Sequence, residues 1–363
     1  MNEAGLNMAD QRIKEHARIL VEYSTNVQAG DMVYMISALD AHQLAVEVVK
    51  KCAERGAATL TVMDSSDINR GYMDAATDQA LDVFPKHQME AIKASDVLIR
   101  LASPSNTRAM AGVDPKRLMR RQTTTKPISE EVLNKRWCLT LHPNQALAQE
   151  AKMSLTEYQD FVYGATLLDW EKEALLMRKL RDKLQKHSTI RFIGKDTDLK
   201  ASTKDRKWVS AEGTNNMPSG EVFTSPKEKT VEGKIYFDIP FLYAGTEIQG
   251  VYLEFEKGRV VNHSAEKGQD ALEAALNADD GSRYLGEMAI GTNRGIKKYT
   301  LNMLFDEKIG DTIHCALGNA YPECKGTNQS AVHVDIIKSM KDDGKIIAGD
   351  FVIYNRGKYF WEQ

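Results

Sequence analysis

The chain of 363 residues is poor in cysteine and has no long hydrophobic run. Its four cysteines are scattered and form no Cys-x-x-Cys pair, which argues against a disulfide framework and indicates a reducing compartment. No stretch approaches the roughly 20 apolar residues of a transmembrane helix. The first residues also lack the basic and apolar regions of a secretory signal peptide. We therefore expect a cytoplasmic protein with no membrane partner.

The chain also lacks a strong excess of either charge, since its formal net charge is −3. This balance argues against a dedicated nucleic-acid-binding protein. Residues 116–121 are locally basic, and we interpret them as a solvated helix face rather than a phosphate-binding patch. The Gly-x-Gly-x-x-Gly fingerprint of dinucleotide-binding domains is absent. The composition thus gives no indication of a nucleic-acid partner.

The length suggests about two domains, and the first half has the pattern of an α/β domain. Residues 32–37 and 59–63 read as strands, and residues 39–55 between them have apolar side chains at helical spacing. This βαβ unit predicts a parallel sheet. From Ser154, where Glu157 completes a capping box, the pattern is helical to about residue 186.

After residue 189 the pattern changes to short alternating segments separated by glycine turns, interrupted by one predicted helix at about 266–276. We therefore predict an N-terminal α/β domain with a parallel sheet over residues 1–187. A C-terminal, β-rich α+β domain over residues 188–363 follows, and all the candidate functional residues fall in it.

His333 and Asp335 are the first candidates for chemistry. They lie two apart in an apolar, β-branched run, and a strand directs every second side chain to the same face. An imidazole and a carboxylate side by side are half of a metal site, although an ordinary ion pair has the same pattern.

Four residues upstream could complete such a site. Glu287 is an acid in an apolar, small-residue stretch, and a buried carboxylate needs a partner or a metal. His314 has apolar neighbours, which also suit a core histidine, and Tyr321 follows seven residues later. Glu221 follows a turn and alone would suit solvated surface. We interpret the acidic and basic residues 306–308 as a helix cap or surface turn.

Three carboxylates, two imidazoles and a phenol form a nitrogen and oxygen donor set that is large enough for two divalent metals. No thiolate is required, which argues against a structural zinc site of the cysteine type.

Several ordered strings resemble one family, the dinuclear metallo-aminopeptidases of the aminopeptidase T, aminopeptidase S and PepS type. The matching strings are residues 219–226, 285–291, 305–310, 314–321 and 333–335, with residues 26–31, 153–157 and 160–163 in the first half. The likeness spans nearly the whole chain. The segment from Tyr321 to His333 is shorter than in typical members.

The resemblance implies six metal ligands, namely Glu221, Glu287, His314, Tyr321, His333 and Asp335. It implies that Glu287 bridges two divalent ions, of zinc, cobalt, manganese or magnesium. It also implies a homodimer and a peptide substrate with a free N-terminus.

The expected reaction is hydrolysis of the N-terminal residue by a water molecule activated between two metals. Tyr321 is expected to act as a ligand or as a hydrogen-bond donor to the developing oxyanion. Glu221 is a candidate general base if it is not a ligand.

Two alternatives remain open from the residues. His314, His333 and Asp335 alone form the two-histidine, one-carboxylate triad of mononuclear Fe(II) enzymes, such as a ring-cleaving dioxygenase. The second alternative is a non-catalytic binding protein with a vestigial site.

Overall fold

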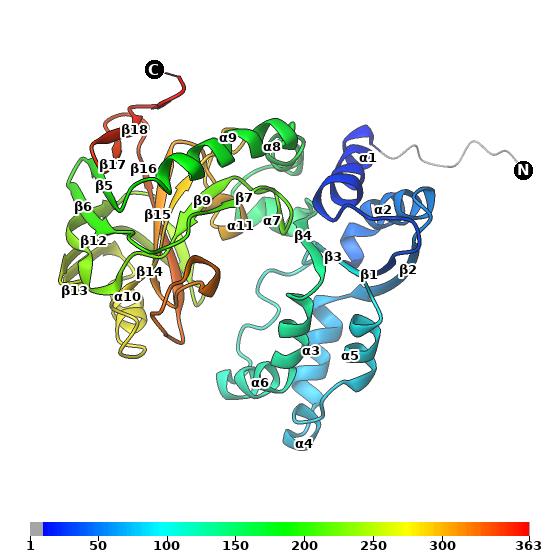
Figure 1. Cartoon of the computed structure of the whole chain (residues 1–363). Helices are drawn as coiled ribbons and strands as arrows, with labels where there is room; N and C mark the ends of the chain where they lie inside the picture. Colours follow the sequence, from blue (N-terminus) through cyan, green and yellow to red (C-terminus); the bar gives the residue numbers. More distant parts are fainter. Residues whose placement is uncertain (1–9, 363) are drawn as a thin grey trace, which may run out of the picture. The chain divides into compact units, whose positions relative to one another are not determined.

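The computed structural model describes residues 10–362, and Figure 1 shows the order of its elements along the chain. The chain divides into two compact units. Unit 1 contains the chain up to Leu167 together with residues 213–218, and unit 2 contains residues 168–212 and the chain from Ser219 onward. The predicted boundary between residues 187 and 188 falls inside unit 2, after helix α9 (Trp170–Leu184).

Unit 1 is built on a five-stranded parallel sheet in the order β2-β1-β3-β4-β8. Its strands are β1 (Met32–Ala38), β2 (Ala58–Asp64), β3 (Val97–Ala102), β4 (Arg136–Leu141) and β8 (Asn216–Met217). Helix α2 (His42–Glu54) connects β1 to β2 and buries Leu44, Val48 and Cys52 at helical spacing. The predicted βαβ unit and parallel sheet are therefore confirmed.

The remaining helices of unit 1 include the predicted capping box. Helix α8 begins after Ser154, whose hydroxyl accepts from the backbone N–H of Glu157, while the Glu157 carboxylate accepts from the backbone N–H of Ser154. The other helical elements are α1 (Gln11–Arg18) with a π-helical turn (Ile19–Ser24), α3 (Ser66–Ala75), α4 (Asp78–Leu81), α5 (Lys86–Lys93), α6 (Pro115–Val132), α7 (Gln145–Glu150) and α8 (Leu155–Thr166).

The basic residues 116–121 lie on α6, and part of this face is paired within unit 1. Arg120 binds Asp78 and Asp82, with nitrogen–oxygen distances of 2.7 and 2.6 Å. Arg117 donates to the backbone carbonyls of Met73 and Ala76. These guanidinium groups therefore connect helices of the protein itself.

Unit 2 contains two antiparallel sheets, as the alternating pattern of the second half predicts. The larger sheet has the order β11-β12-β10-β6-β5-β17-β18-β19, with β13 paired to β12. Its strands are β5 (Thr189–Gly194), β6 (Thr197–Ser202), β10 (Glu232–Phe237), β11 (Phe241–Tyr243), β12 (Thr246–Glu256), β13 (Arg259–Lys267), β17 (Lys345–Ala348), β18 (Phe351–Asn355) and β19 (Lys358–Tyr359).

The smaller sheet of unit 2 has the order β16-β15-β14-β9-β7 and carries the candidate site. Its strands are β7 (Val209–Ala211), β9 (Glu221–Thr224), β14 (Leu285–Gly291), β15 (Thr312–Gly318) and β16 (His333–Ser339). Every residue of β9, β14 and β15 is buried. Unit 2 also contains α9, α10 (Gln269–Leu276) and α11 (Met303–Asp306).

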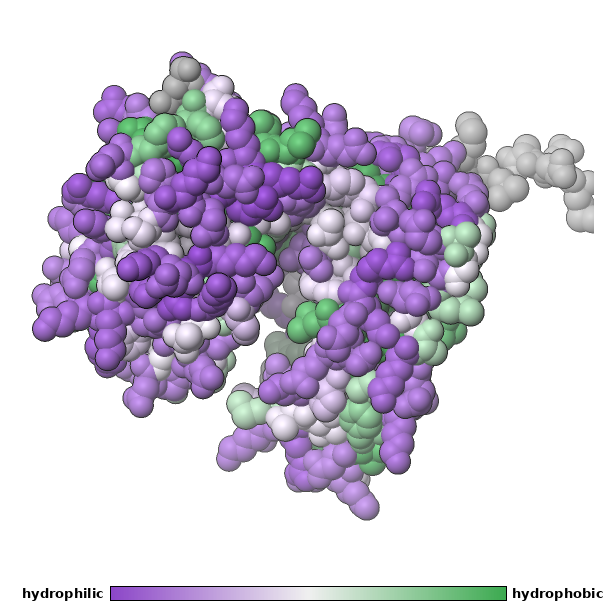
Figure 2. Space-filling model, viewed as in Figure 1, coloured by the Kyte–Doolittle hydropathy of each residue, from purple (hydrophilic) through white to green (hydrophobic). Residues whose placement is uncertain are grey.

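The face of the molecule in Figure 2 is mostly hydrophilic, with separate apolar patches. Some exposed apolar side chains belong to β2, where Leu60, Val62 and Met63 face solvent at the edge of the parallel sheet. Among residues 10–362, no helix is both long enough and apolar enough to cross a lipid bilayer.

Candidate metal centre

Four adjacent strands of the smaller sheet place five of the predicted ligands. Glu287 on β14 and Asp335 on β16 both lie opposite Ala316 of the intervening strand β15. Directly opposed residues project to the same face of a sheet, and so do residues two apart on one strand. His314, two residues before Ala316, and His333, two residues before Asp335, therefore lie on the same face as both carboxylates.

Glu221 joins this face from β9, the next strand in the sheet, where it pairs with Gly291 of β14. The glycine before it has a φ of +122°, and a Cβ atom there would lie only 2.7 Å from Cβ of Asn293. Gly220 therefore allows the backbone to turn into β9 while Asn293 packs against it. The side-chain amide of Asn293 donates to the carbonyl of Ser219 at 2.9 Å, which fixes the start of the strand.

The side chains form two groups that share Glu287. One group contains Glu221, Glu287 and His314, and the other contains Glu287, His333 and Asp335, with the donor atoms of each group within 4.8 Å of one another. Nε2 of His314 lies 3.4 Å from Glu221 and 3.6 Å from Glu287. Nε2 of His333 lies 3.2 Å from Glu287 and 3.5 Å from Asp335. This arrangement suits two cations that share one carboxylate.

The polar atoms that face one another in these groups fit a metal better than they fit each other. Nδ1 of His333 lies 2.8 Å from the carbonyl oxygen of Asn319, so Nδ1 carries the proton and donates it there. In the neutral ring this leaves a lone pair on Nε2. Within the described chain, Nε2 of His333 and Oδ1 of Asp335 are buried without a hydrogen-bond partner of acceptable geometry. Buried unpaired donor atoms of this kind are what a metal ion would satisfy.

The carboxylates of this face control the protonation of its two histidines. Burial alone would lower the pKa of His314, but the carboxylates of Glu287 and Glu221 raise it to about 9. Burial would also lower the pKa of His333, but the carboxylates of Asp335 and Glu287 outweigh this effect and raise the pKa to about 11. Burial raises the pKa of Glu221 to about 8. The raised pKa values of both imidazoles indicate that the carboxylates of this face favour positive charge beside them.

Tyr321, the sixth predicted ligand, borders the cluster from outside the sheet. It precedes the short 3₁₀ turn Pro322–Cys324, and its ring centroid lies 5.0 Å from that of His333 and 5.6 Å from that of Phe223. Burial, together with the nearby carboxylates, raises the pKa of its phenol. The segment from His314 to Gly318 is a strand and not a helix. Tyr321 therefore reaches the site through the turn that follows β15.

Glu307 and Lys308 also lie at the site, although the sequence analysis placed residues 306–308 in a helix cap or surface turn. The segment does end a helix, since Asp306 is the last residue of α11 and Glu307 is its C-cap. It is not a surface turn, because Lys308 is fully buried and its ammonium contacts Glu307 and lies 3.7 Å from Glu221. Asp306 is also buried, and it accepts hydrogen bonds from the backbone and hydroxyl of Thr300. The alternation of charges before Gly310 does not distinguish this buried segment from a solvated one.

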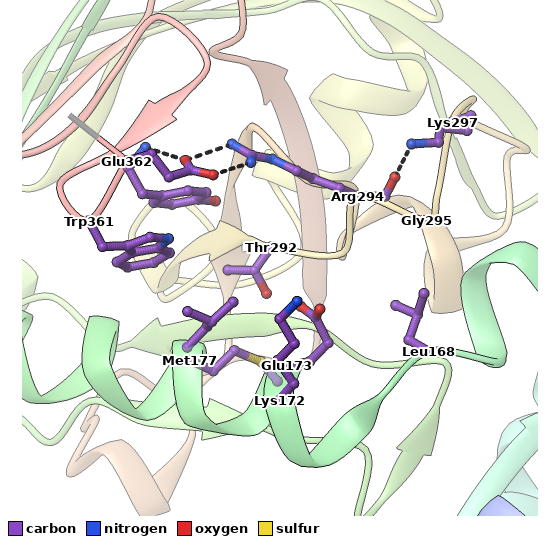
Figure 3. A pocket seen from close by; sticks show the side chains of 12 residues that line it. Leu168, Lys172, Glu173, Met177, Thr292, Arg294, Gly295, Lys297, Trp361 and Glu362 are labelled. Carbon is purple, nitrogen blue, oxygen red and sulfur yellow. Dashed lines mark hydrogen bonds and ion pairs between the residues drawn. The ribbon is translucent and has the colours of Figure 1, made fainter.

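A separate pocket of about 390 Å³ in unit 2 is lined by α9, the residues after β14 and the C-terminal segment. In Figure 3, Arg294 reaches toward Glu362, and the two side chains approach to 2.5 Å. Arg294 also pairs with Asp311 at 2.9 Å, and burial raises the pKa of Glu173 on the opposite wall. None of the six predicted ligands lines this pocket.

Comparison with known proteins identifies the family. The family described as thermophilic metalloprotease (M29) matches residues 9–359. The chain belongs to the M29 family. The family resemblance and the enzyme class predicted from the sequence, a metallopeptidase, are therefore confirmed.

Individual M29 relatives agree with this assignment. The chain is 27% identical to aminopeptidase AmpS of Bacillus subtilis, over 92% of this chain and 93% of the relative. The solved structure of AmpT from Thermus thermophilus has a TM-score of 0.83 at 22% identity, covering 96% of this chain and 99% of that one. A 2,5-dihydroxypyridine dioxygenase from Pseudomonas putida has a TM-score of 0.61 at 14% identity, covering 96% of both chains, which shows a shared fold alone.

Proposed function

We propose that this chain is a metal-dependent aminopeptidase that removes the N-terminal residue from peptides with a free N-terminus. The observation that carries the proposal is the sharing of Glu287 by two groups of donor atoms. The M29 family and a curated relative that is named an aminopeptidase support the reaction class.

The proposed site holds two divalent ions between the carboxylates and imidazoles of Glu221, Glu287, His314, His333 and Asp335. Two divalent ions in such a site lower the pKa of a water molecule toward neutrality and polarise the scissile carbonyl. The ions proposed are zinc, cobalt, manganese or magnesium.

The residues of the chain orient the site and handle charge in this proposal. The hydrogen bond from Nδ1 of His333 to the Asn319 carbonyl keeps the imidazole ring in one tautomer and one orientation. Tyr321, which packs against that ring, is placed to ligate or to donate its hydroxyl proton to the oxyanion that develops on the carbonyl. The free amine of the substrate would serve as a further metal ligand at the cluster, which would restrict cleavage to the N-terminal bond.

The test uses protein stripped of metal with a chelator and reloaded with Zn²⁺, Co²⁺, Mn²⁺ or Mg²⁺. We expect metal-dependent release of the first residue from aminoacyl-p-nitroanilides and dipeptides. An N-acetylated peptide of the same sequence should resist cleavage, because it lacks the free amine. Absence of metal-dependent release across a broad substrate panel would contradict the proposal.

Among the similar proteins, a shared fold is all that supports the mononuclear Fe(II) dioxygenase alternative. A mononuclear site of two histidines and Asp335 does not need Glu221 or Glu287, yet both lie within ion-pair distance of His314. Metal analysis distinguishes the alternatives, with two ions per chain expected for the aminopeptidase and one iron for the dioxygenase. The non-catalytic alternative predicts that Glu287→Ala leaves the metal content unchanged.

The homodimer stays a prediction, and light scattering coupled to size-exclusion chromatography measures it directly. The cytoplasmic location also stays a prediction.

A further inference from the structure

The pocket beside α9 in unit 2 has the size and the walls of a small-molecule site. Its volume of about 390 Å³ lies at the lower end of the roughly 300–1,000 Å³ that ligand pockets span. Apolar side chains of α9 and of the residues before it line one part, among them Leu168, Leu176 and Met177, and Trp361 lines another. A cavity of this size accommodates a small molecule rather than an extended peptide.

The C-terminal wall of this pocket is fixed by the protein before any ligand binds. The Tyr359 hydroxyl donates to the Gly291 carbonyl at 2.8 Å, and the backbone N–H of Tyr359 donates to the Glu362 carboxylate at 2.8 Å. The rings of Tyr359 and Trp361 are stacked with their centroids 4.7 Å apart. The aromatic wall therefore has a defined shape, as a binding site requires.

Three of the five charged side chains that line the pocket are already engaged by the protein. The Arg294 guanidinium donates to the Glu362 carboxylate at 2.5 Å and to the Asp311 carboxylate at 2.9 Å. The Lys297 ammonium contacts the backbone carbonyl of Arg294. A ligand would have to displace these contacts to bind Arg294, Lys297 or Glu362.

Glu173 and Lys172 are the two charged groups that remain for a ligand. Both line the pocket from α9 (Figure 3), and within residues 10–362 neither side chain makes a hydrogen bond or an ion pair. Adjacent residues on a helix do not face each other, so the two groups do not satisfy one another. Glu173 is half-buried, and burial raises the pKa of its carboxyl in spite of the charges of Lys172 and Arg294. A half-buried carboxylate without a partner favours a ligand that carries an ammonium group.

We propose that this pocket binds a free α-amino acid with an apolar side chain. The α-ammonium group donates to the Glu173 carboxylate, the Lys172 ammonium donates to the α-carboxylate, and the ligand's side chain lies against Met177 and Trp361. An α-amino acid fits because it carries both charges on one carbon atom, as α9 carries the two complementary charges on adjacent residues.

This inference goes beyond the proposed peptidase activity, although a free amino acid is what that activity would release. None of the six candidate metal ligands lines the pocket, so the amino acid would bind at a second site.

The first test is calorimetric titration of the full chain with L-leucine after a chelator has removed all metal. Without metal, the amine of leucine has no ion to bind at the cluster. We expect saturable binding of leucine. N-acetylleucine, which lacks the ammonium group, and leucinamide, which lacks the carboxylate, should bind roughly 10–100-fold more weakly, the range for one hydrogen bond to a charged group. No binding of leucine, methionine or phenylalanine would overturn the proposal, and so would equal binding of leucine and N-acetylleucine.

Glu173→Gln keeps the shape of the side chain and removes its charge, so the affinity for leucine should fall roughly 10–100-fold. Glu171→Gln is the matched control, since Glu171 lies in the same first turn of α9 but is exposed and does not line the pocket. It should bind leucine as the wild type does. Lys172→Met should weaken the binding of leucine but not that of leucinamide, which has no carboxylate. Wild-type affinity in Glu173→Gln, or an equal loss in both glutamate variants, would contradict the proposal.

Tryptophan fluorescence locates the ligand. Leucine should change the emission of the wild type, and Trp361→Phe should bind leucine without this change. An emission change that persists in Trp361→Phe would place the ligand elsewhere and refute the proposal.

Glu287→Gln separates this site from the metal cluster. It should bind leucine with wild-type affinity, and loss of binding would place the amino acid at the cluster, overturning this inference but not the aminopeptidase proposal. Conversely, a metal-loaded protein that binds leucine in the pocket but cleaves no peptide would overturn the proposed function and support this inference.

Discussion

Replacing Lys308 by methionine should destabilise the metal-free protein strongly. Methionine is close to lysine in length and apolar, so the change removes the ammonium while filling most of its volume. Glu221 would then remain buried, and Glu307 partly buried, without their fixed cation. Removing one partner of a buried ion pair costs about 3–5 kcal/mol, because the remaining charge stays desolvated.

The pH decides where in this range the cost falls. Burial raises the pKa of Glu221 to about 8 in spite of the nearby Lys308 ammonium, and loss of that ammonium raises it further, so this carboxylate is more fully protonated in the variant at pH 6 than at pH 9. We expect a loss of about 3 kcal/mol at pH 6 and about 5 kcal/mol at pH 9. For a unit of this size these losses correspond to a decrease in melting temperature of roughly 6–20 °C.

The assay is thermal unfolding at both pH values, with chelator and then with a divalent metal. Metal should restore more stability to the variant than to the wild type, because it supplies the missing positive charge. Lys338→Met is the matched control, since Lys338 on β16 is also buried, but within the described chain it makes no ion pair and only donates to the Lys195 carbonyl at 3.4 Å. Equal melting temperatures for Lys308→Met and wild type in chelator, or an equal decrease in both variants, would refute the reasoning.

Three further predictions concern the same sheet. Glu287→Gln should lose both metals, because both donor groups contain this residue, whereas Asp335→Asn should lose one. Mass-spectrometric metal analysis measures both losses, and equal losses in the two variants would contradict the prediction. Gly220→Ala should cost more stability than Gly245→Ala in denaturant titrations. Both glycines have a positive φ, where strain alone costs about 1–3 kcal/mol, but an added Cβ would meet Asn293 only at Gly220. Equal losses of stability in the two variants would contradict the argument. In chelator, stability should fall as the pH rises from about 7 to 10. The pKa values of the two site histidines are raised to about 9 and about 11, above the unfolded value, so their contribution to stability is full below about 6.5 and is lost as they deprotonate. A melting temperature that does not change with pH would count against this.

Local signals in the sequence predicted the elements whose two faces differ. The helix at residues 39–55 buries one side, and the structure has a helix over His42–Glu54 after a short 3₁₀ turn. The capping box at Ser154 is satisfied as its spacing predicts. The helix expected at residues 266–276 begins later, at Gln269, because β13 extends to Lys267. Its start is set by pairing with β12, a tertiary contact that the local pattern does not contain.

The strands that carry the site were harder to predict because both of their faces are buried. Alternation disappears when a strand is covered on both sides, and β14 and β15 are buried at every position. The segment after His314 could therefore be taken for a helix or a strand. Only at β16, where the candidate ligands interrupt an apolar run, did the two-residue period remain visible.

The charge of the cluster explains why Lys308 matters for the two-metal proposal. Glu221, Glu287, Glu307 and Asp335 carry four negative charges when ionised, and Lys308 compensates one of them. A single divalent ion would leave the buried cluster negative, which is costly in a region of low dielectric constant. Two divalent ions would exceed the remaining charge by one unit, which a single hydroxide balances. Under the two-metal proposal, a cluster of this composition would favour two metals and a deprotonated water over one metal alone, and Lys308→Met should shift that preference.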